Sequence, residues 1–141
     1  MEAIDVKRSV GAGSAFTVLD HTTAITLGTT TPSVTIGFGT WLVFGRVVAG
    51  QVNASCAGTE TLTVALKDAS ANVIATTSVL LLEGTTLGCS LGTIVLPPSL
   101  VNNSSPTMTP DILVFHASLS ADPSAGSVTI TEAEIIAIKL Y

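Results

Sequence analysis

Two histidines and two cysteines are the side chains best suited to bind a metal ion: His21, His116, Cys56 and Cys89. Together they could supply the two nitrogen and two sulfur ligands of a tetrahedral zinc site. Such sites usually bring their ligands in closely spaced pairs, whereas these four residues are scattered along the chain. The sequence therefore predicts no zinc site, and we expect His116 to be an ordinary strand residue.

The residue patterns of common enzymes and phosphate sites are missing from the sequence. A nucleophile elbow needs the spacing G-x-S-x-G, which GAGSAF at 11–16 does not have. The GAG at 11–13 is followed by no Lys-Ser or Lys-Thr pair, so it predicts a flexible joint rather than a phosphate loop. The His-x-His ligands of cupin enzymes do not occur. We therefore expect no enzymatic activity, no catalytic residue and no cofactor.

A few charged residues lie within apolar or alternating segments. Glu132 and Glu134 alternate on one face of an expected strand, where they could bind calcium together with loop carbonyls. Arg46 and Lys139 are cations inside apolar strands. Each either lies at a contact between subunits and pairs with Glu132, Glu134 or an acid of the partner, or simply reaches solvent at a strand edge. Both interpretations of these two cations remain open from the residues alone.

The overall charge excludes one class of ligand. The net charge is −5 with a pI near 4.6, and only five residues are basic. These are too few to neutralise several phosphates at once, so we expect no nucleic-acid partner. Charged residues make up 11% of the chain, against about 25% in an average soluble protein. A surface this poor in charge is expected to adhere to other surfaces unless it is covered.

The sequence also argues against membrane insertion and export. Its apolar runs are short, and none approaches the ~20 residues needed to cross a bilayer. The first ten residues lack the apolar core of a secretory signal, so we expect an N-terminus without a leader. Two cysteines are too few for a disulfide framework. The reduced state is favoured for Cys56 and Cys89, with a single bridge between them as the alternative.

The elements that would position these residues are β-strands. Threonine is frequent, the aliphatic residues are largely β-branched, and turn signals are closely spaced. This pattern predicts one all-β domain of eight to ten antiparallel strands, a sandwich or barrel over residues 21–141. Residues 1–20 show no sustained period and predict an arm, and residues 99–110 predict a polar loop after Pro97-Pro98. The expected strand segments are 22–28, 29–37, 39–54, 60–68, 72–84, 91–99, 111–120 and 126–141.

The longest expected strand begins with GTWLVFGRVVAG, residues 39–50. Trp41, Val43 and Val47 would face one way, while Leu42 and Phe44 face the other, as the twofold period of a strand requires. The strand is therefore apolar on both faces. Either the second face is covered by other subunits, or a loop or arm of the same chain covers it.

Four segments carry a resemblance to a known family: 39–50, TLTVALKDASANVIATTSV at 61–79, DILVFHASLS at 111–120 and IIAIKLY at 135–141. In their order they resemble the trimeric jelly-roll domain of the C1q and tumour-necrosis-factor-like superfamily. The likeness is greatest to compact versions in bacteriophage virion proteins: head decoration proteins, fibre heads and receptor-binding tips. Its features are the Gly39-Thr40-Trp41 opening, the small polar turn of residues 67–72 and the closing strand of residues 137–140. The scarcity of aromatic residues, 4%, separates this chain from the extracellular animal members.

The resemblance implies a C1q/TNF-like antiparallel jelly-roll sandwich that forms a homotrimer, with the last strand beside the threefold axis. It implies that the chain contacts copies of itself and not a membrane. The expected trimer interface comprises Trp41, Leu42, Phe44, Arg46, Val48, Phe115, Ile138, Lys139, Leu140 and Tyr141.

The function that the resemblance implies is structural. We expect a bacteriophage capsid decoration or cement protein, located in the virion after assembly in the host cytoplasm. Its partner would be the major capsid protein or a neighbouring virion protein. The alternative is a receptor- or glycan-binding tip of a tail or fibre, with residues 99–110 in the binding surface. The residues expected to attach the arm to the capsid are Glu2, Ile4, Val6, Lys7, Arg8 and Val10.

Overall fold

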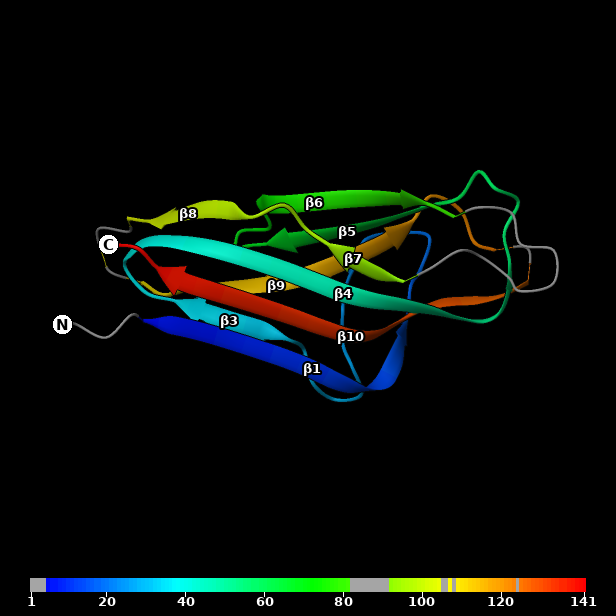
Figure 1. Cartoon of the computed structure of the whole chain (residues 1–141), viewed down its shortest axis with the longest axis horizontal. Coiled ribbons are helices and arrows are strands. Elements are labelled where there is room, and N and C mark those ends of the chain that lie inside the picture. The colour runs from blue at the N-terminus through cyan, green and yellow to red at the C-terminus, as the bar shows by residue number, and fades with distance from the viewer. Residues whose placement is uncertain (1–4, 82–91, 105–106, 108, 124) are drawn as a thin grey trace.

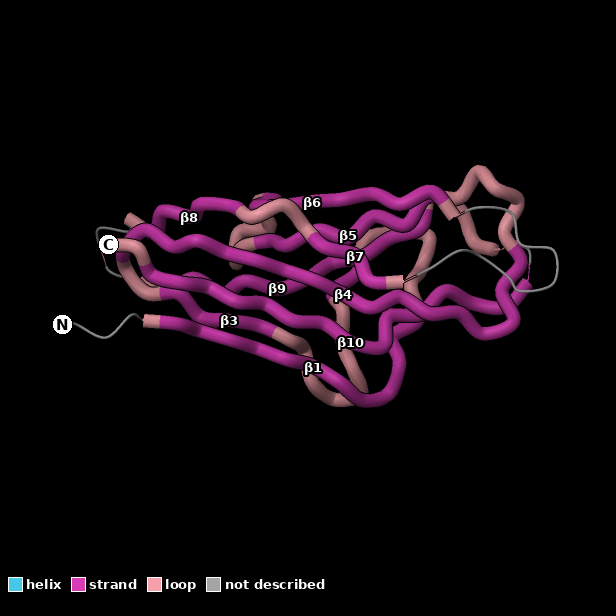
Figure 2. Tube along the Cα trace, in the orientation of Figure 1, coloured by secondary structure: helices cyan, strands magenta, loops and turns pink. Residues whose placement is uncertain are grey.

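Two five-stranded antiparallel sheets form a sandwich in the computed structural model, which describes residues 5–81, 92–104, 107, 109–123 and 125–141. Figure 1 shows the two layers, and Figure 2 shows that strands and loops make up the described chain. Every strand pairing recorded among these residues is antiparallel. The prediction of an all-β antiparallel sandwich is therefore confirmed.

The first sheet, sheet A, has β10 and β4 at its centre. Its order is β1-β10-β4-β7, and β8 also pairs with β4. The second sheet, sheet B, has the order β2-β9-β5-β6, and β3 also pairs with β9. The strand bounds are β1 Val6–Thr17, β2 Thr23–Ala24, β3 Ser33–Ile36, β4 Gly39–Ser55, β5 Thr61–Lys67, β6 Val73–Leu80, β7 Thr93–Val95, β8 Ser99–Asn103, β9 Asp111–Leu119 and β10 Ala125–Lys139.

The core lies between the sheets and is built from alternate residues of the long strands. Trp41, Val43 and Val47 of β4 are at most 1% exposed. From sheet B, Phe115 of β9 is fully buried and packs against the backbone of Gly45. A Cβ at position 45 would lie 2.9 Å from the Phe115 ring, so glycine leaves room for this ring of the facing sheet. The twofold period of 39–50 thus predicted correctly which residues share a face.

The hairpin of β5 and β6 confirms another prediction, a turn at residues 67–72. The Asp68 carboxylate accepts hydrogen bonds from the backbone N–H groups of Ser70 and Asn72, both at 2.9 Å. Ala71 adopts φ 64°, a conformation that the surrounding turn imposes on a non-glycine residue. The Asn72 amide also donates to Asp68, and the pKa of Asp68 is lowered because these bonds outweigh the opposing effect of burial.

Residues 1–20 differ from the predicted arm, since Val6–Thr17 forms β1, which pairs with β10 from Val6 to Ala12 and again at Phe16 and Thr17. The backbone of β10 supplies the hydrogen-bond partners, although the side chains of β1 follow no clean alternation. Gly11, interpreted from sequence as part of a flexible joint, is buried, and a Cβ there would lie 2.4 Å from Pro32 Cγ. At this position glycine therefore permits close packing. Glu2 and Ile4 lie outside the described residues.

The predicted loop of residues 99–110 begins with a strand that the sequence analysis missed. β7 and β8 both pair with the same edge of β4, and Pro97-Pro98 lies in the break between them. The double proline interrupts the ladder because neither ring nitrogen can donate a hydrogen bond, as predicted. The chain then returns to the same edge of β4 rather than leaving it.

The prediction that the cysteines are reduced is wrong for Cys56, which is disulfide-bonded. The other cysteine of the sequence, Cys89, lies outside the described residues. The prediction rested on the N-terminal residues, which do not determine whether a second sulfur comes within bonding distance of Cys56. Cys56 opens the turn between β4 and β5, where the buried Glu60 carboxylate accepts backbone hydrogen bonds from Ala57 and Gly58. The Ala57 bond is the main reason why the pKa of Glu60 is lowered.

Candidate functional site

The outer surface of sheet A carries far more apolar side chains than an ordinary solvent-exposed face of a sheet. Its side chains are the alternate residues of β4 and β10 that point away from the core, joined by their neighbours on the flanking strands. We call this surface the A face. Its apolar and charged members, on which the argument below depends, are Val6, Arg8 and Val10 of β1, Leu42, Phe44, Arg46 and Val48 of β4, Val95 of β7, Leu100 of β8, and Glu132, Glu134, Ile136 and Ile138 of β10.

The strand register places these residues in rows across the sheet. Ile138 lies beside Val6 on one side and Leu42 on the other, and Leu42 lies beside Leu100. The outer members of the A face are the most exposed: Leu100 and Val95 show 67% and 65% of their surface to solvent. Aliphatic side chains therefore extend across the sheet from one edge to the other.

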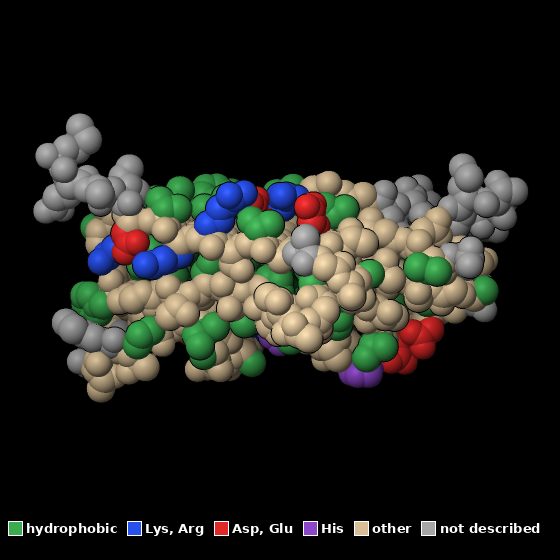
Figure 3. Space-filling model, turned by 90° about the horizontal axis from the view of Figure 1, so that it is seen from below, with side chains coloured by type: hydrophobic (Ala, Val, Ile, Leu, Met, Phe, Trp, Pro, Cys, Tyr) green, Lys and Arg blue, Asp and Glu red, His purple; other side chains and the backbone are tan. Residues whose placement is uncertain are grey.

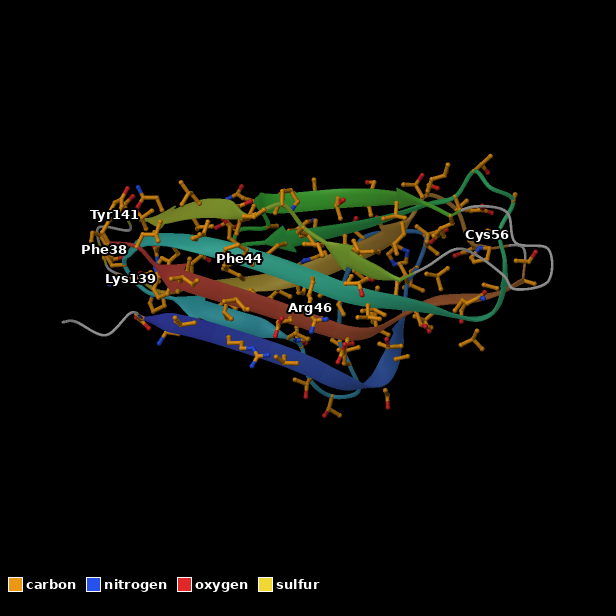
Figure 4. The ribbon with its side chains drawn as sticks, viewed as in Figure 1. Phe38, Phe44, Arg46, Cys56, Lys139 and Tyr141 are labelled. Carbon is orange, nitrogen blue, oxygen red and sulfur yellow. The ribbon has the colours of Figure 1, made fainter. Side chains whose placement is uncertain are left out.

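A small cluster of opposite charges lies in the middle of this apolar surface. Glu134, whose side chain is only 12% exposed, accepts hydrogen bonds from Arg8 at 2.6 and 2.9 Å and from Arg46 at 3.1 Å. Arg46 also lies 3.6 Å from Glu132. Figure 4 shows Phe44 and Arg46 on β4, in the middle of sheet A. Two arginines and two glutamates balance, so the A face carries no net charge.

The hydrogen bonds from Arg8 lower the pKa of Glu134, with a further contribution from Arg46, against the opposing effect of burial. Glu134 is therefore ionised at neutral pH. Within the single chain, the guanidinium of Arg46 pairs with Glu132 and Glu134, two of the acids expected for it. The structure also shows that Glu132 and Glu134 contact arginines, which is at odds with the alternative of a calcium site there. Among the described residues, no three His, Cys, Asp or Glu side chains form a group that could hold a metal ion.

A shallow pocket of about 120 Å³ lies beside the charge cluster. Its walls are mainly apolar, with the arginine and glutamate at one side. Such a cavity has the size to receive one side chain and lies within the A face. The lining residues are Phe44, Gly45, Arg46, Val95, Glu134 and Ile136.

The residues predicted for the trimer interface fall into three groups. Leu42, Phe44, Arg46, Val48 and Ile138 lie together on the A face. Trp41 and Phe115 are instead in the core, 1% and 0% exposed, so they have no surface to offer a partner. The remaining three, at the end of β10 and beyond it, are exposed at one end of the sandwich: Lys139, Leu140 and Tyr141.

The described residues of the predicted capsid-attachment arm lie on different sides of β1. Val6, Arg8 and Val10 belong to the A face, and Lys7 is exposed on the other side of β1. Lys7 lies 3.5 Å from the carboxylate of Asp5. The described part of this segment is therefore placed by its pairing with β10.

Val95, Leu100 and Ile136 of the A face were missed by the sequence analysis. Ile136 alternates with Ile138 in the closing strand, so the period alone could have assigned it. Val95 and Leu100 have no such signal, because each belongs to a strand of five or fewer residues. Their place on the A face depends on pairing with β4, which a local pattern does not reveal.

The outer surface of sheet B has a different chemistry. Serines and threonines lie opposite one another, as in the 2.9 Å contact between the hydroxyls of Thr63 and Ser78. His116 is here, and burial lowers its pKa, with a smaller effect from Lys67. We call this surface the B face: Ser33, Thr35, Thr61, Thr63, Ala65, Lys67, Thr76, Ser78, Leu80, Ile112, Val114, His116 and Ser118.

Solved viral structures contain a similar sandwich. A structure of infectious bursal disease virus, Gx strain, aligns with 99% of this chain at a TM-score of 0.52 and 16% sequence identity. The chain spans 33% of the length of that viral chain. The VP2 subviral particle of the same virus aligns with 96% of this chain and 33% of its own, at 15% identity and a TM-score of 0.48.

The fold is therefore an all-β jelly-roll sandwich like one found in a viral particle. At this level of identity the likeness concerns the fold alone. No family model matches the chain, and no curated protein sequence matches it. In the described residues, no helix has the length and apolar character needed to span a bilayer.

Proposed function

We propose that this protein is a virion structural protein and that it forms a homotrimer through the A face. The single observation that carries the proposal is the A face itself: aliphatic side chains extend across the sheet around a neutral charge cluster. Exposed aliphatic surface on this scale is typical of protein interaction sites. The jelly-roll likeness to a viral structure supports the virion as the place of that interaction.

A second copy of this chain fits the A face in both chemistry and geometry. The charges of the cluster pair within one chain, so a partner needs to supply apolar surface rather than a compensating charge. Around a threefold axis each subunit makes two unlike contacts. The A face has two unlike margins, with Val95 and Leu100 on one side and Val6 and Val10 on the other. One margin of each subunit would face the opposite margin of the next.

The mass of the purified protein tests the trimer. Sedimentation at micromolar concentration is expected to give a species of about three times the 14.3 kDa chain mass. Obligate interfaces commonly bury more than about 2,000 Å² of accessible surface, which predicts a species that persists on dilution. A stable monomer at micromolar concentration would refute assembly through the A face.

Within the virion, we propose a bacteriophage head decoration or cement protein. The end of the sandwich where β1 begins and β10 ends would attach to the shell. Deleting residues 1–20 would remove β1 and uncover β10, so it cannot separate attachment from folding. Deleting only residues 1–4 leaves β1 in place. The shortened trimer is expected to lose binding to capsids that lack the protein, and undiminished binding would show that these residues do not attach it.

Copy number separates this role from the alternative of a receptor- or glycan-binding tip. A head decoration protein is present in hundreds of copies per particle, whereas a tail or fibre tip is present in a few dozen at most. Quantitative mass spectrometry of purified virions gives the number directly. Antibody labelling in electron micrographs then locates the protein on the head or the tail, and a tail location would refute the decoration role.

A further inference from the structure

A groove of about 720 Å³ opens along the edge of the sandwich where β1 and β3 lie side by side. Its volume falls within the range of about 300–1,000 Å³ that ligand sites occupy. Residues of both sheets and of the connection between β3 and β4 form its walls. They are Asp5, Lys7, Arg8, Ser33, Val34, Thr35, Gly37, Phe38, Trp41, Pro110 and Lys139.

Two unpaired strand edges border this groove. In the described part of the chain β1 pairs only with β10, and β3 pairs only with β9. Each strand therefore has one edge whose backbone N–H and C=O groups do not belong to a ladder. The backbone N–H of Ser33 reaches across to the hydroxyl of Ser9 at 3.2 Å, which joins the two edges. Away from this hydrogen bond, unpaired strand edges of this kind can accept an extended polypeptide segment by backbone hydrogen bonding.

The groove is basic although the protein as a whole is acidic. Lys7, Arg8 and Lys139 are three of the five basic residues in a chain of net charge −5, while Asp5 is the one acid in the lining. Figure 3 faces this edge and shows basic side chains gathered along part of it. Lys7 lies near Asp5, and Arg8 is held by Glu134. No ion pair recorded among the described residues involves Lys139, which leaves its ammonium group available.

Aromatic side chains form the apolar part of the lining. Phe38 is 48% exposed, and the indole N–H of Trp41 is held by the carbonyl of Gly37 at 3.0 Å. Trp41 is 1% exposed and lies in the wall of the groove beneath its surface, where, as the single tryptophan of the chain, it can report on binding by its emission. Figure 4 shows Phe38 and Lys139 close together at one end of the sandwich.

We propose that this groove binds an extended acidic segment of a partner polypeptide. The free strand edges would supply backbone hydrogen bonds, Phe38 would contact an apolar side chain, and Lys139 with Lys7 would pair with carboxylates. Three cations suit a peptide with up to three acids and are too few for a nucleic acid. The groove lies on the edge of the sandwich, so this proposal does not depend on trimer formation through the A face.

The probe is a hexapeptide of alternating valine and glutamate, compared with one of alternating valine and glutamine. Binding to the full-length protein is followed by the emission of Trp41 and by calorimetry at low salt. We expect the glutamate peptide to bind at least tenfold more tightly than the glutamine peptide. Raising the salt concentration is expected to weaken binding of the glutamate peptide alone, because salt screens exposed charges.

The variant Lys139→Glu tests the site, with Lys67→Glu on the B face as a control of the same charge change. Lys139→Glu is expected to weaken binding of the glutamate peptide at least fivefold, and Lys67→Glu less than twofold. Circular dichroism of both variants establishes that the sandwich is intact. The proposal is overturned if neither peptide binds, if the two peptides bind equally, or if the two variants weaken binding equally.

Discussion

The A face and the B face lie on opposite sides of one core, yet their side chains differ in kind. On the A face, aliphatic side chains surround four charged residues whose charges cancel. On the B face, hydroxyl groups such as those of Thr63 and Ser78 bond to each other and can also bond to water. We therefore expect the A face to be covered by another protein surface and the B face to remain solvated. Exposure alone does not identify an interaction surface, since both faces are accessible in the single chain.

The largest expected effect is on assembly. Phe44→Asp places a charge in the middle of the A face, where burial between subunits would leave it unpaired at a cost of several kcal/mol. We expect this variant to sediment as a 14.3 kDa monomer. Thr63→Asp makes a matched change on the B face and is expected to leave the trimer intact. A trimeric Phe44→Asp variant, or dissociation by Thr63→Asp, would remove the distinction between the faces.

A second prediction concerns the contact between Gly45 of sheet A and the Phe115 ring of sheet B. In Gly45→Ala the new Cβ would lie 2.9 Å from the Phe115 ring, so we expect a loss of about 1–3 kcal/mol in the free energy of unfolding. Gly50→Ala is the control, because a Cβ there would lie at an ordinary 3.5 Å from Thr129 Oγ1. Urea denaturation measures both variants. Equal stability of the two would show that the sheets can separate locally without cost.

The charge cluster predicts a dependence of stability on pH. Because the pKa of Glu134 in the folded protein lies below its ordinary value of 4.5, its contribution is complete above pH 4.5 and is lost as the pH falls through the folded pKa. Glu134→Gln is expected to lower the free energy of unfolding at pH 7 by about 1 kcal/mol and to reduce its loss in acid.

The matched control is Glu132→Gln, since Glu132 is 44% exposed and its contact with Arg46 is longer. We expect a smaller change from it at pH 7. Denaturation curves collected between pH 3 and pH 7 compare the two variants with the parent protein. Identical acid dependence in Glu134→Gln and the parent would contradict the assigned role of Glu134.

The smallest effect is expected on the B face. Replacing Thr63 and Ser78 together by valine removes one exposed hydrogen bond and keeps the β-branched shape at position 63. We expect a change in the free energy of unfolding within about 0.5 kcal/mol and no change in sedimentation. New self-association of this variant would show that a few added methyl groups are enough to make an interface. The hydroxyl groups of the B face would then be what prevents self-association through that surface.

The sequence predicted the central elements of the fold better than its edges. Alternation along β4 assigned Trp41 and Leu42 to opposite faces, which is correct, because that pattern is local. It did not reveal which face lies in the core, so Trp41 and Phe115 were expected at an interface and lie inside the sandwich. β1 and β8 were missed because pairing with β10 and β4 stabilises them rather than their own pattern.

By itself, the sequence determined the all-β class, the antiparallel hairpin around residues 67–72 and the two-sided apolar character of β4. Each of these follows from side-chain types within a few neighbouring positions. Only the tertiary structure decided that Arg8 and Arg46 meet Glu134, from 126 and 88 positions away. It also decided that Lys7 and Lys139 line one groove. The reason is physical: the register between strands distant in sequence is set by packing across the whole sheet.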